Sequence, residues 1–225
     1  MDLIQIGKSV LSSCMDVKAG ESVLVITDDK KLPIGNALYQ AAKELGAEAL
    51  LMTMEPRKVS GEEPPAVVAA AMLAADVIVC PMSTSITHTK AKIAAVQAGA
   101  RIATMPGISE DMFSQGAMTA DYDVVLELTH RVTDLLSKAS TARIEKAGHV
   151  LTLDLTGRPG VPSPGVYREK GQGGNLPSGE AYIAPLEDSS NGTMVIDGSM
   201  VGVGLLSSPL TVTVKDGKLQ SITGA

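Results

Sequence analysis

The sequence predicts an α/β fold, a doubly wound parallel sheet with Rossmann- or flavodoxin-like layers, followed by a second, β-rich part. Through the first 139 residues, short apolar runs alternate with amphipathic helix-like segments. The runs are apolar on both faces, which is typical of parallel strands that helices cover on both sides. After about residue 140, Gly and Pro become frequent and the helix-like segments stop. We therefore expect an α/β domain over residues 1–139 and a β-rich domain over residues 140–225.

The order of the expected elements in the first part follows from their periodicity. Strands are predicted at 22–29, 48–54, 76–82 and 101–107, and helices at 33–47, 64–75, 87–100 and 121–139. Pro33 near a helix start and Gly46 at its end are typical boundary residues. Open parallel sheets bind ligands beyond the carboxyl ends of their strands. We therefore expect the loops 27–33, 81–92 and 104–111 to meet at one ligand-binding rim.

The second part is expected to consist mainly of hairpins. A strand or hairpin is expected over 142–160, and strand-like runs occupy 181–188, 192–200 and 210–222. Asp216-Gly217, between two alternating apolar runs, is a strong hairpin signal, and Asn191-Gly192 is a second pair of the same kind.

Composition excludes several classes of protein. The net charge is −6 and Lys and Arg never gather in more than a pair, so a nucleic-acid partner is not expected. The N-terminus has no charged region before an apolar core, and no apolar run reaches the length of a membrane span. We therefore expect a cytoplasmic protein without a membrane partner. Cys14 and Cys80 lie far apart in apolar contexts, which favours two reduced, buried thiols.

Common catalytic motifs are missing from the sequence. The first strand is not followed by a Gly-x-Gly-x-x-Gly loop, and no Gly-x-x-x-x-Gly-Lys-Ser/Thr loop occurs, so nucleotide binding is not supported. No Gly-x-Ser-x-Gly motif is present either. Ser178 has no evident base beside it, and Cys80 closes a buried strand, where a thiol is inert. Catalytic residues therefore stay unassigned.

The segment 83–92 offers one candidate binding site. His88 and Lys90 lie where a strand end meets a helix start, and Thr87 is the expected N-cap. The helix-start amides together with Lys90 could hold a carboxylate or phosphate of a substrate. The alternative is a capped helix with a solvated His88 and Lys90. For His130, on a helix, and His149, in a strand, a surface position is the simpler interpretation.

Residues 171–185, GQGGNLPSGEAYIAP, place the carboxylate of Glu180 behind a run rich in Gly and Pro. Such a loop lets the backbone pass close to an ion or ligand, so Glu180 is either a metal ligand or a hairpin residue. No His-Glu-x-x-His motif accompanies it, and the three histidines are scattered. The candidate carboxylates of the second part are Asp154, Glu169, Glu180, Glu187, Asp188 and Asp197.

Four segments carry a resemblance to a known family. They are THTKA (87–91), ARIATMPG (100–107), TGRPG (156–160) and above all GNLPSGEAYIAPLEDSSNGTMVIDGS (174–199). In this order they resemble the thermophilic leucyl aminopeptidase (aminopeptidase T) family of dinuclear metallopeptidases. A branch of similar sequences contains iron dioxygenases that cleave dihydroxypyridine rings.

The resemblance implies an α/β N-terminal domain followed by the start of a metal-binding catalytic domain, in a homodimer. It implies that Glu180 is a metal ligand. The family's other ligands lie in a segment beyond the hairpins, for which this sequence has no counterpart. The chain is therefore expected to be truncated, inactive alone and without a tightly bound ion.

Three functions stay open at this point. The first is a metal-dependent aminopeptidase that uses Zn, Co, Mn or Mg ions and releases N-terminal amino acids from small peptides or amino-acid-derived substrates. The second is an Fe(II)-dependent dioxygenase that cleaves dihydroxypyridine rings. The third is a non-catalytic α/β module that binds a ligand at the rim around His88 and Lys90.

Overall fold

The computed structural model describes residues 2–224, which form two compact units. The first unit contains the chain up to Thr129 together with Ser163–Glu180. The second contains His130–Pro162 and the residues from Ala181 onward. The expected domain boundary after residue 139 stays a prediction.

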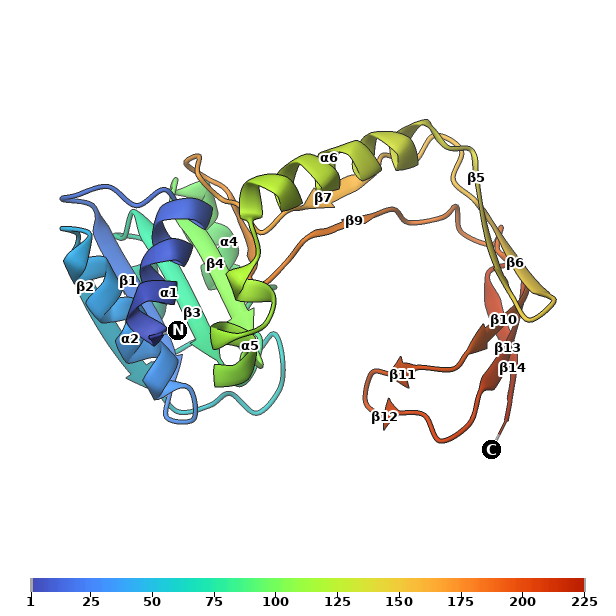
Figure 1. Cartoon of the computed structure of the whole chain (residues 1–225), viewed down its shortest axis with the longest axis horizontal. Coiled ribbons are helices and arrows are strands. Elements are labelled where there is room, and N and C mark those ends of the chain that lie inside the picture. Colours follow the sequence, from blue (N-terminus) through green and yellow to red (C-terminus); the bar gives the residue numbers. More distant parts are fainter. Residues whose placement is uncertain (1, 225) are drawn as a thin grey trace. The chain divides into compact units, whose positions relative to one another are not determined.

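A five-stranded parallel sheet forms the centre of the first unit (Figure 1). Its strand order is β2-β1-β3-β4-β8, and every neighbouring pair is parallel. The strands are β1 (Ser22–Asp28), β2 (Glu48–Met54), β3 (Val77–Met82), β4 (Arg101–Pro106) and β8 (Gly173–Asn175). The order reverses beside β1, as in doubly wound folds. The predicted α/β fold class is confirmed.

Helices cover both faces of this sheet, as the strand sequences require. Alternate residues of a strand point to opposite faces. Val23, Val25 and Val79 pack in a core with α1 (Leu3–Ser9), η1 (Val10–Cys14) and α2 (Leu32–Glu44), whereas Leu24, Ile26 and Ile78 pack with α3 (Ala66–Met72) and α4 (Lys90–Gln97). The helices α5 (Glu110–Ser114), η2 (Ala117–Thr119) and α6 (Tyr122–Lys138) follow β4. No helix within residues 2–224 is long and apolar enough to cross a membrane.

The second unit contains an antiparallel sheet of order β14-β13-β10-β6-β5. Its strands are β5 (Thr141–Lys146), β6 (His149–Asp154), β10 (Asn191–Ile196), β13 (Leu210–Lys215) and β14 (Lys218–Thr223). Asp216-Gly217 forms the turn between β13 and β14, as expected, and both residues have positive φ. The second turn-type pair is different: Asn191-Gly192 lies inside β10, where a side chain at Gly192 would collide with the carbonyl oxygen of Val150.

Two short strand pairs complete the described chain. One joins β7 (Val161–Ser163) to β9 (Glu180–Tyr182), and the other joins β11 (Ser199–Met200) to β12 (Gly204–Leu205). The expected strand over 181–188 is therefore reduced to its first two residues, since β9 ends at Tyr182.

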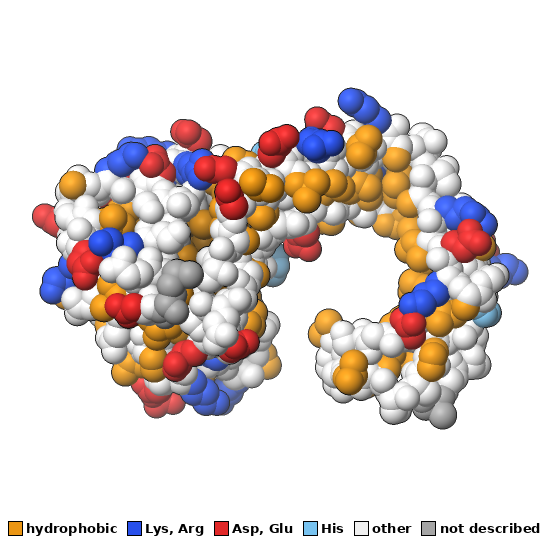
Figure 2. All heavy atoms as spheres, viewed as in Figure 1, with side chains coloured by type: hydrophobic (Ala, Val, Ile, Leu, Met, Phe, Trp, Pro, Cys, Tyr) orange, Lys and Arg blue, Asp and Glu red, His pale blue; other side chains and the backbone are white. Residues whose placement is uncertain are grey.

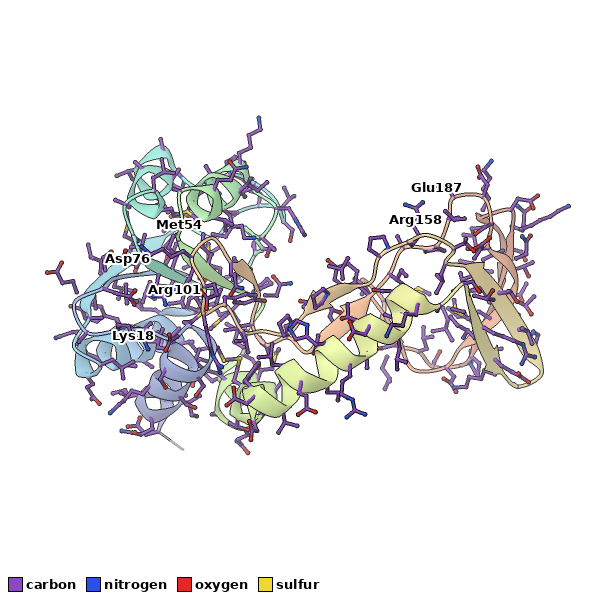
Figure 3. All side chains as sticks on the ribbon, turned by 90° about the horizontal axis from the view of Figure 1, so that it is seen from above. Lys18, Met54, Asp76, Arg101, Arg158 and Glu187 are labelled. Atoms are coloured by element: carbon purple, nitrogen blue, oxygen red, sulfur yellow. The ribbon has the colours of Figure 1, made fainter. Side chains whose placement is uncertain are left out.

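Arg101, at the start of β4, is a buried cation with complete pairing. Its guanidinium forms an ion pair with Glu21 and donates to the carbonyl oxygen of Asp16 at 3.1 Å. Figure 3 shows Arg101 near Lys18 and Asp76, at the amino ends of the strands. A buried charge without such partners would be costly. Arg101 therefore has a structural role at the amino ends of the strands, and the rim lies at their carboxyl ends.

Both cysteines are free and buried, as the sequence indicated. Burial raises the pKa of Cys14 and of Cys80 to about 12. The thiolate is the nucleophilic form, so both groups are protonated and unreactive near neutral pH.

We expect an aromatic disulfide reagent at pH 8 to label the folded chain at least ~100-fold more slowly than the denatured chain. Absorbance of the released thiolate measures both rates, and denaturation should release two thiols per chain. Fast labelling of the folded chain at Cys80 would contradict this placement.

Candidate functional site

The loops at the carboxyl ends of β1, β3 and β4 meet, as expected for a ligand-binding rim. Asp28, the last residue of β1, is buried and accepts hydrogen bonds from the backbone and hydroxyl of Ser83, which follows β3. The amide of Gly107, after β4, donates to the carbonyl oxygen of Met82 at 2.7 Å. The crevice between β1 and β3, where such folds bind ligands, is therefore crossed by the chain's own hydrogen bonds.

The start of α4 differs from the expectation in two ways. Thr89, and not Thr87, is the N-cap: its hydroxyl accepts from the amide of Lys92 at 3.2 Å. The Glu63 carboxylate accepts from the amides of Lys90 and Ala91 at 2.6 and 3.1 Å. The amides that would bind an external anion thus hold an internal one.

The side chains of His88 and Lys90 are exposed on this loop and helix start. Neither forms a hydrogen bond or ion pair with Glu180 within residues 2–224. Their expected contact with a substrate stays a prediction.

Thr87 belongs instead to a hydrogen-bond cluster, which we call the rim network and define as Ser85, Thr87, Thr104 and Asn175; the two threonines are buried and the other two residues are partly buried. Asn175 Oδ1 accepts from the hydroxyls of Thr87 and Thr104 at 3.0 and 2.8 Å. The two threonine hydroxyls lie 2.8 Å apart, and Ser85 donates to Thr87 at 2.9 Å. The network joins the ends of β3 and β4 to β8, so it fixes the segment that leads to Glu180.

Strand β8 explains the glycines before Glu180. A Cβ at Gly173 would lie 2.8 Å from the carbonyl oxygen of Ile102, and one at Gly174 would overlap the phenol of Tyr167. The Tyr167 hydroxyl donates to the carbonyl oxygen of Asn175 at 2.8 Å. Only residues without a side chain fit between β4 and Tyr167, so this Gly-rich run is a close-packed strand.

The segment between β8 and Glu180 is held at several points. The amide of Leu176 donates to the carbonyl oxygen of Thr104 at 2.8 Å. The Ser178 hydroxyl donates to the carbonyl oxygen of Ser163 at 2.7 Å, so Ser178 is paired structurally and has no base beside it. The Leu176–Pro177 peptide bond is cis.

Glu180 begins β9 and its side chain is exposed. It lies close enough to Tyr167 to affect it: burial is the main cause that raises the pKa of the Tyr167 phenol, and the negative charge of Glu180 adds to this effect.

The described residues do not complete a metal site around Glu180. Within residues 2–224, no three His, Cys, Asp or Glu side chains come close enough together to hold an ion. Four of the other candidate carboxylates have partners elsewhere. Glu187 pairs with Arg158 (Figure 3), Asp197 with Lys146 and Asp188 with Lys218, and Asp154 accepts from the amide of Thr156. His149 contacts the Thr193 hydroxyl at 3.0 Å, and His130 is exposed. One carboxylate supplies one ligand of the four or more that iron or zinc needs.

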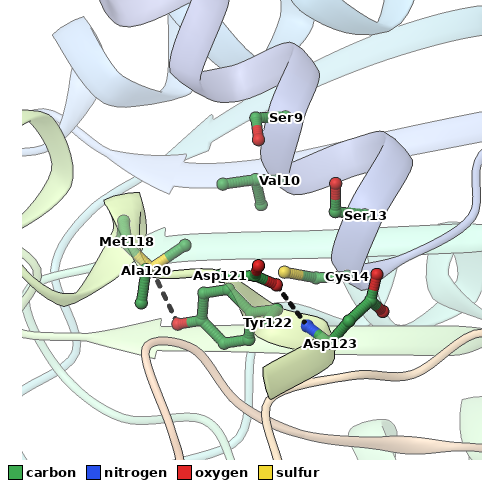
Figure 4. A pocket seen from close by; sticks show the side chains of 9 residues that line it. All are labelled: Ser9, Val10, Ser13, Cys14, Met118, Ala120, Asp121, Tyr122 and Asp123. Carbon is green, nitrogen blue, oxygen red and sulfur yellow. Dashed lines mark hydrogen bonds between the residues drawn. The ribbon is translucent and has the colours of Figure 1, made fainter. Parts of the chain in front are cut away.

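A polar pocket of about 200 Å³ lies between η1 and the start of α6 (Figure 4). Cys14 and Tyr122 line it together with Ser9, Ser13 and Asp121. Asp121 accepts from the amide of Asp123 at 3.0 Å and so caps the helix. None of the residues selected from the sequence as site candidates lies in this pocket.

The sequence interpretation also missed Lys92, on α4. Its side chain is half-buried, and its Nζ lies 3.4 Å from the carbonyl oxygen of Gly173. Burial lowers the pKa of Lys92. In the sequence THTKAK, Lys92 looks like an ordinary helix residue exposed to solvent. Only the position of β8 beside α4 shows that its side chain is half-buried.

Comparison with known proteins decides the family. The family model of NicX, 2,5-dihydroxypyridine 5,6-dioxygenase, matches residues 2–225. The chain belongs to this family. A comparison with curated proteins gives no match.

Two solved structures show the same fold as this NicX family member. The 2,5-dihydroxypyridine dioxygenase of Pseudomonas putida KT2440 matches with a TM-score of 0.78 and 22% identity, over 98% of this chain and 67% of that one. Wild-type AmpT of Thermus thermophilus matches with a TM-score of 0.66 and 14% identity, over 98% of this chain and 70% of that one. The chain thus spans roughly two thirds of each neighbour, and at these identities the likeness is one of fold.

The expectation of a leucyl aminopeptidase, a protease, is therefore wrong. The match to the dioxygenase family overturns it, and the resemblance to aminopeptidase T holds for the fold alone. The physical reason lies in the segment 174–199. Its first two residues, Gly174 and Asn175, belong to β8, and Asn175 belongs to the rim network, so this part of the pattern follows from the packing of the sheet and does not indicate a peptidase.

We expect Gly174→Ala to lower the free energy of unfolding by about 2 kcal/mol, because the new methyl group overlaps the Tyr167 ring. Urea unfolding followed by circular dichroism measures the change. Gly198→Ala is the control, since a Cβ there meets open space. Equal stability of the two variants would contradict the packing of β8.

We expect Thr104→Val to cost about 1–2 kcal/mol, because Asn175 loses a donor inside the rim network. The same unfolding measurement applies. Thr53→Val, at an exposed position of β2, is the matched control and should change stability by less than about 0.5 kcal/mol. A Thr104 variant as stable as the control would show that the network does not hold β8.

Proposed function

We propose that this chain is part of an Fe(II)-dependent dioxygenase that cleaves the ring of a dihydroxylated pyridine. The match of the NicX family model to residues 2–225 is the observation that carries the proposal. The fold shared with the Pseudomonas putida enzyme supports it. By its description, the family's reaction takes place at the ring bond between C5 and C6.

We propose Glu180 as a ligand of the iron. Carboxylate oxygen is a usual ligand of non-haem Fe(II), which keeps open positions for a substrate and dioxygen when it is bound. Within residues 2–224, the chain offers Glu180 as one such carboxylate but no complete ligand set. The support for Glu180 is its place: five residues after Asn175, on a segment fixed to the rim.

This arrangement assigns separate tasks to the residues around Glu180. The rim network and the Ser163–Ser178 pair keep the segment in one position, which limits the freedom of the carboxylate. His88 follows Thr87 of that network and is exposed, so it is the candidate donor to an oxygen of the ring substrate. Lys90 is the second candidate, with its positive charge beside the same loop.

Oxygen uptake tests the proposed activity. The native protein is loaded with Fe(II) without oxygen, and 2,5-dihydroxypyridine is then added with oxygen. We expect one dioxygen to be consumed per ring, together with loss of the ring's ultraviolet absorbance. A protein that holds iron but consumes no oxygen with any dihydroxypyridine isomer would contradict the proposal.

The role of Glu180 has its own test. Because the variant removes a charged ligand, we expect Glu180→Gln to lower both bound iron and oxygen uptake at least ~100-fold. Glu169→Gln, at an exposed carboxylate of the same unit, is the control and should keep both. Normal iron content in the Glu180 variant would exclude it as a ligand and leave the proposed activity standing.

A further inference from the structure

Helix α6 carries a second apolar face besides the one it packs inward. Tyr122, Thr129 and Thr133 are buried on one side of the helix. On another side, Leu128 and Leu135 are 57% and 69% exposed, Val124 precedes them in the same row, and Val132 lies between them. The spacing of four, four and three residues places these four side chains on one stripe. Figure 2 shows hydrophobic side chains along this helix, bordered by acidic and basic ones.

Four charges follow one border of the stripe: Glu127, Arg131, Asp134 and Lys138. They too recur every three or four residues, so they lie in a row on the helix surface. None of them forms an ion pair within 4 Å in the part of the chain that the structure describes. Their order along the helix is acidic, basic, acidic, basic.

We propose that α6 pairs through this stripe with α6 of a second copy of the chain, antiparallel to it. A twofold axis between Val132 and Thr133 brings Glu127 level with Lys138 of the second copy, and Arg131 level with Asp134. In an antiparallel pair related by a twofold axis, the charged border of one helix faces the charged border of the other. Each of the four charges on that border then lies level with a charge of opposite sign on the second copy, which gives four such pairs across the interface.

The apolar side chains fit the same alignment. Leu135 of the second copy is level with the stretch between Leu128 and Val132, so the leucines interdigitate as knobs in holes. In a parallel pair related by a twofold axis, one border of a helix meets the other border of its partner, so the two charged rows would lie on opposite sides of the interface and stay unmatched. An uncharged apolar partner would cover the leucines but leave the charged row unmatched. The charge order therefore favours a second copy.

We expect the association to be weak and to depend on salt. One helix stripe from each copy is smaller than a standard protein interface, which predicts dissociation at micromolar concentrations. The charged row is exposed, so raised salt should weaken the pair through screening.

Sedimentation velocity of the 225-residue chain, over a range of concentrations, gives the dissociation constant. We expect Glu127→Lys to raise it at least ~10-fold, because twofold symmetry turns two attractive pairs into repulsive ones. Lys138→Glu should do the same, and the double variant should return within ~3-fold of the original value. Within one helix, Glu127→Lys places a positive charge four residues before Arg131, and Lys138→Glu places a negative charge four residues after Asp134. The double variant keeps both of these like-charge pairs, so changes within the helix cannot explain a recovery of the dissociation constant. Its recovery therefore reports contacts between copies.

The stripe has its own variants. Leu128→Asp should abolish association while circular dichroism shows an unchanged fold, because this side chain is exposed in the single chain. Ile93→Asp, at a helix position 49% exposed on α4, is the matched control and should keep the dimer. A chain that stays monomeric at every concentration, or a dimer that survives Leu128→Asp, would overturn the proposal. If the double charge variant associates as weakly as the single variants, the antiparallel alignment is wrong.

Discussion

The hydrogen bonds that Asn175 receives from Thr87 and Thr104 are the contacts on which the arrangement around Glu180 depends. They join residues far apart in the sequence at the carboxyl edge of one parallel sheet. Through them, a short strand that arrives long after β4 takes its place beside it. The position of Glu180 follows from this edge strand, since only four residues separate it from Asn175.

The surroundings of the network explain why it is strong. Buried hydroxyl and amide groups cost free energy unless they are paired, and here each oxygen has partners from the chain. The glycines of β8 allow the backbone to approach Ile102 and Tyr167 closely enough for these bonds to form. Packing and hydrogen bonding therefore depend on each other, and the loss of either would release the segment that carries Glu180.

Much of the first unit was predictable because its signals are local. The strand 48–54 was predicted with its observed bounds, and the parallel, doubly covered sheet followed from strands apolar on both faces. Strand β8 could not be predicted, because Gly173, Gly174 and Asn175 have neither apolar side chains nor β propensity. The cap of α4 by Glu63 was missed for a similar reason: its partners lie 27 and 28 residues further along the chain.

The candidate site was less predictable than the fold. The sequence singled out Glu180, but it could not show that Thr87 and Thr104 hold the segment before it, since this needs the sheet order. The segment 174–199 suggested a peptidase, but the family match assigns the chain to the NicX family, and the likeness to AmpT is one of fold. A pattern that maintains backbone geometry can persist while the chemistry at the rim differs.

Amide hydrogen exchange tests most directly whether the segment before Glu180 is part of the sheet. The amide of Leu176 donates to Thr104, and that of Ile102 donates to Gln172, across the edge between β4 and β8. We expect both amides to exchange as slowly as those of the central strands β1 and β3. Exchange of the Leu176 amide at the rate of an open loop would contradict this expectation.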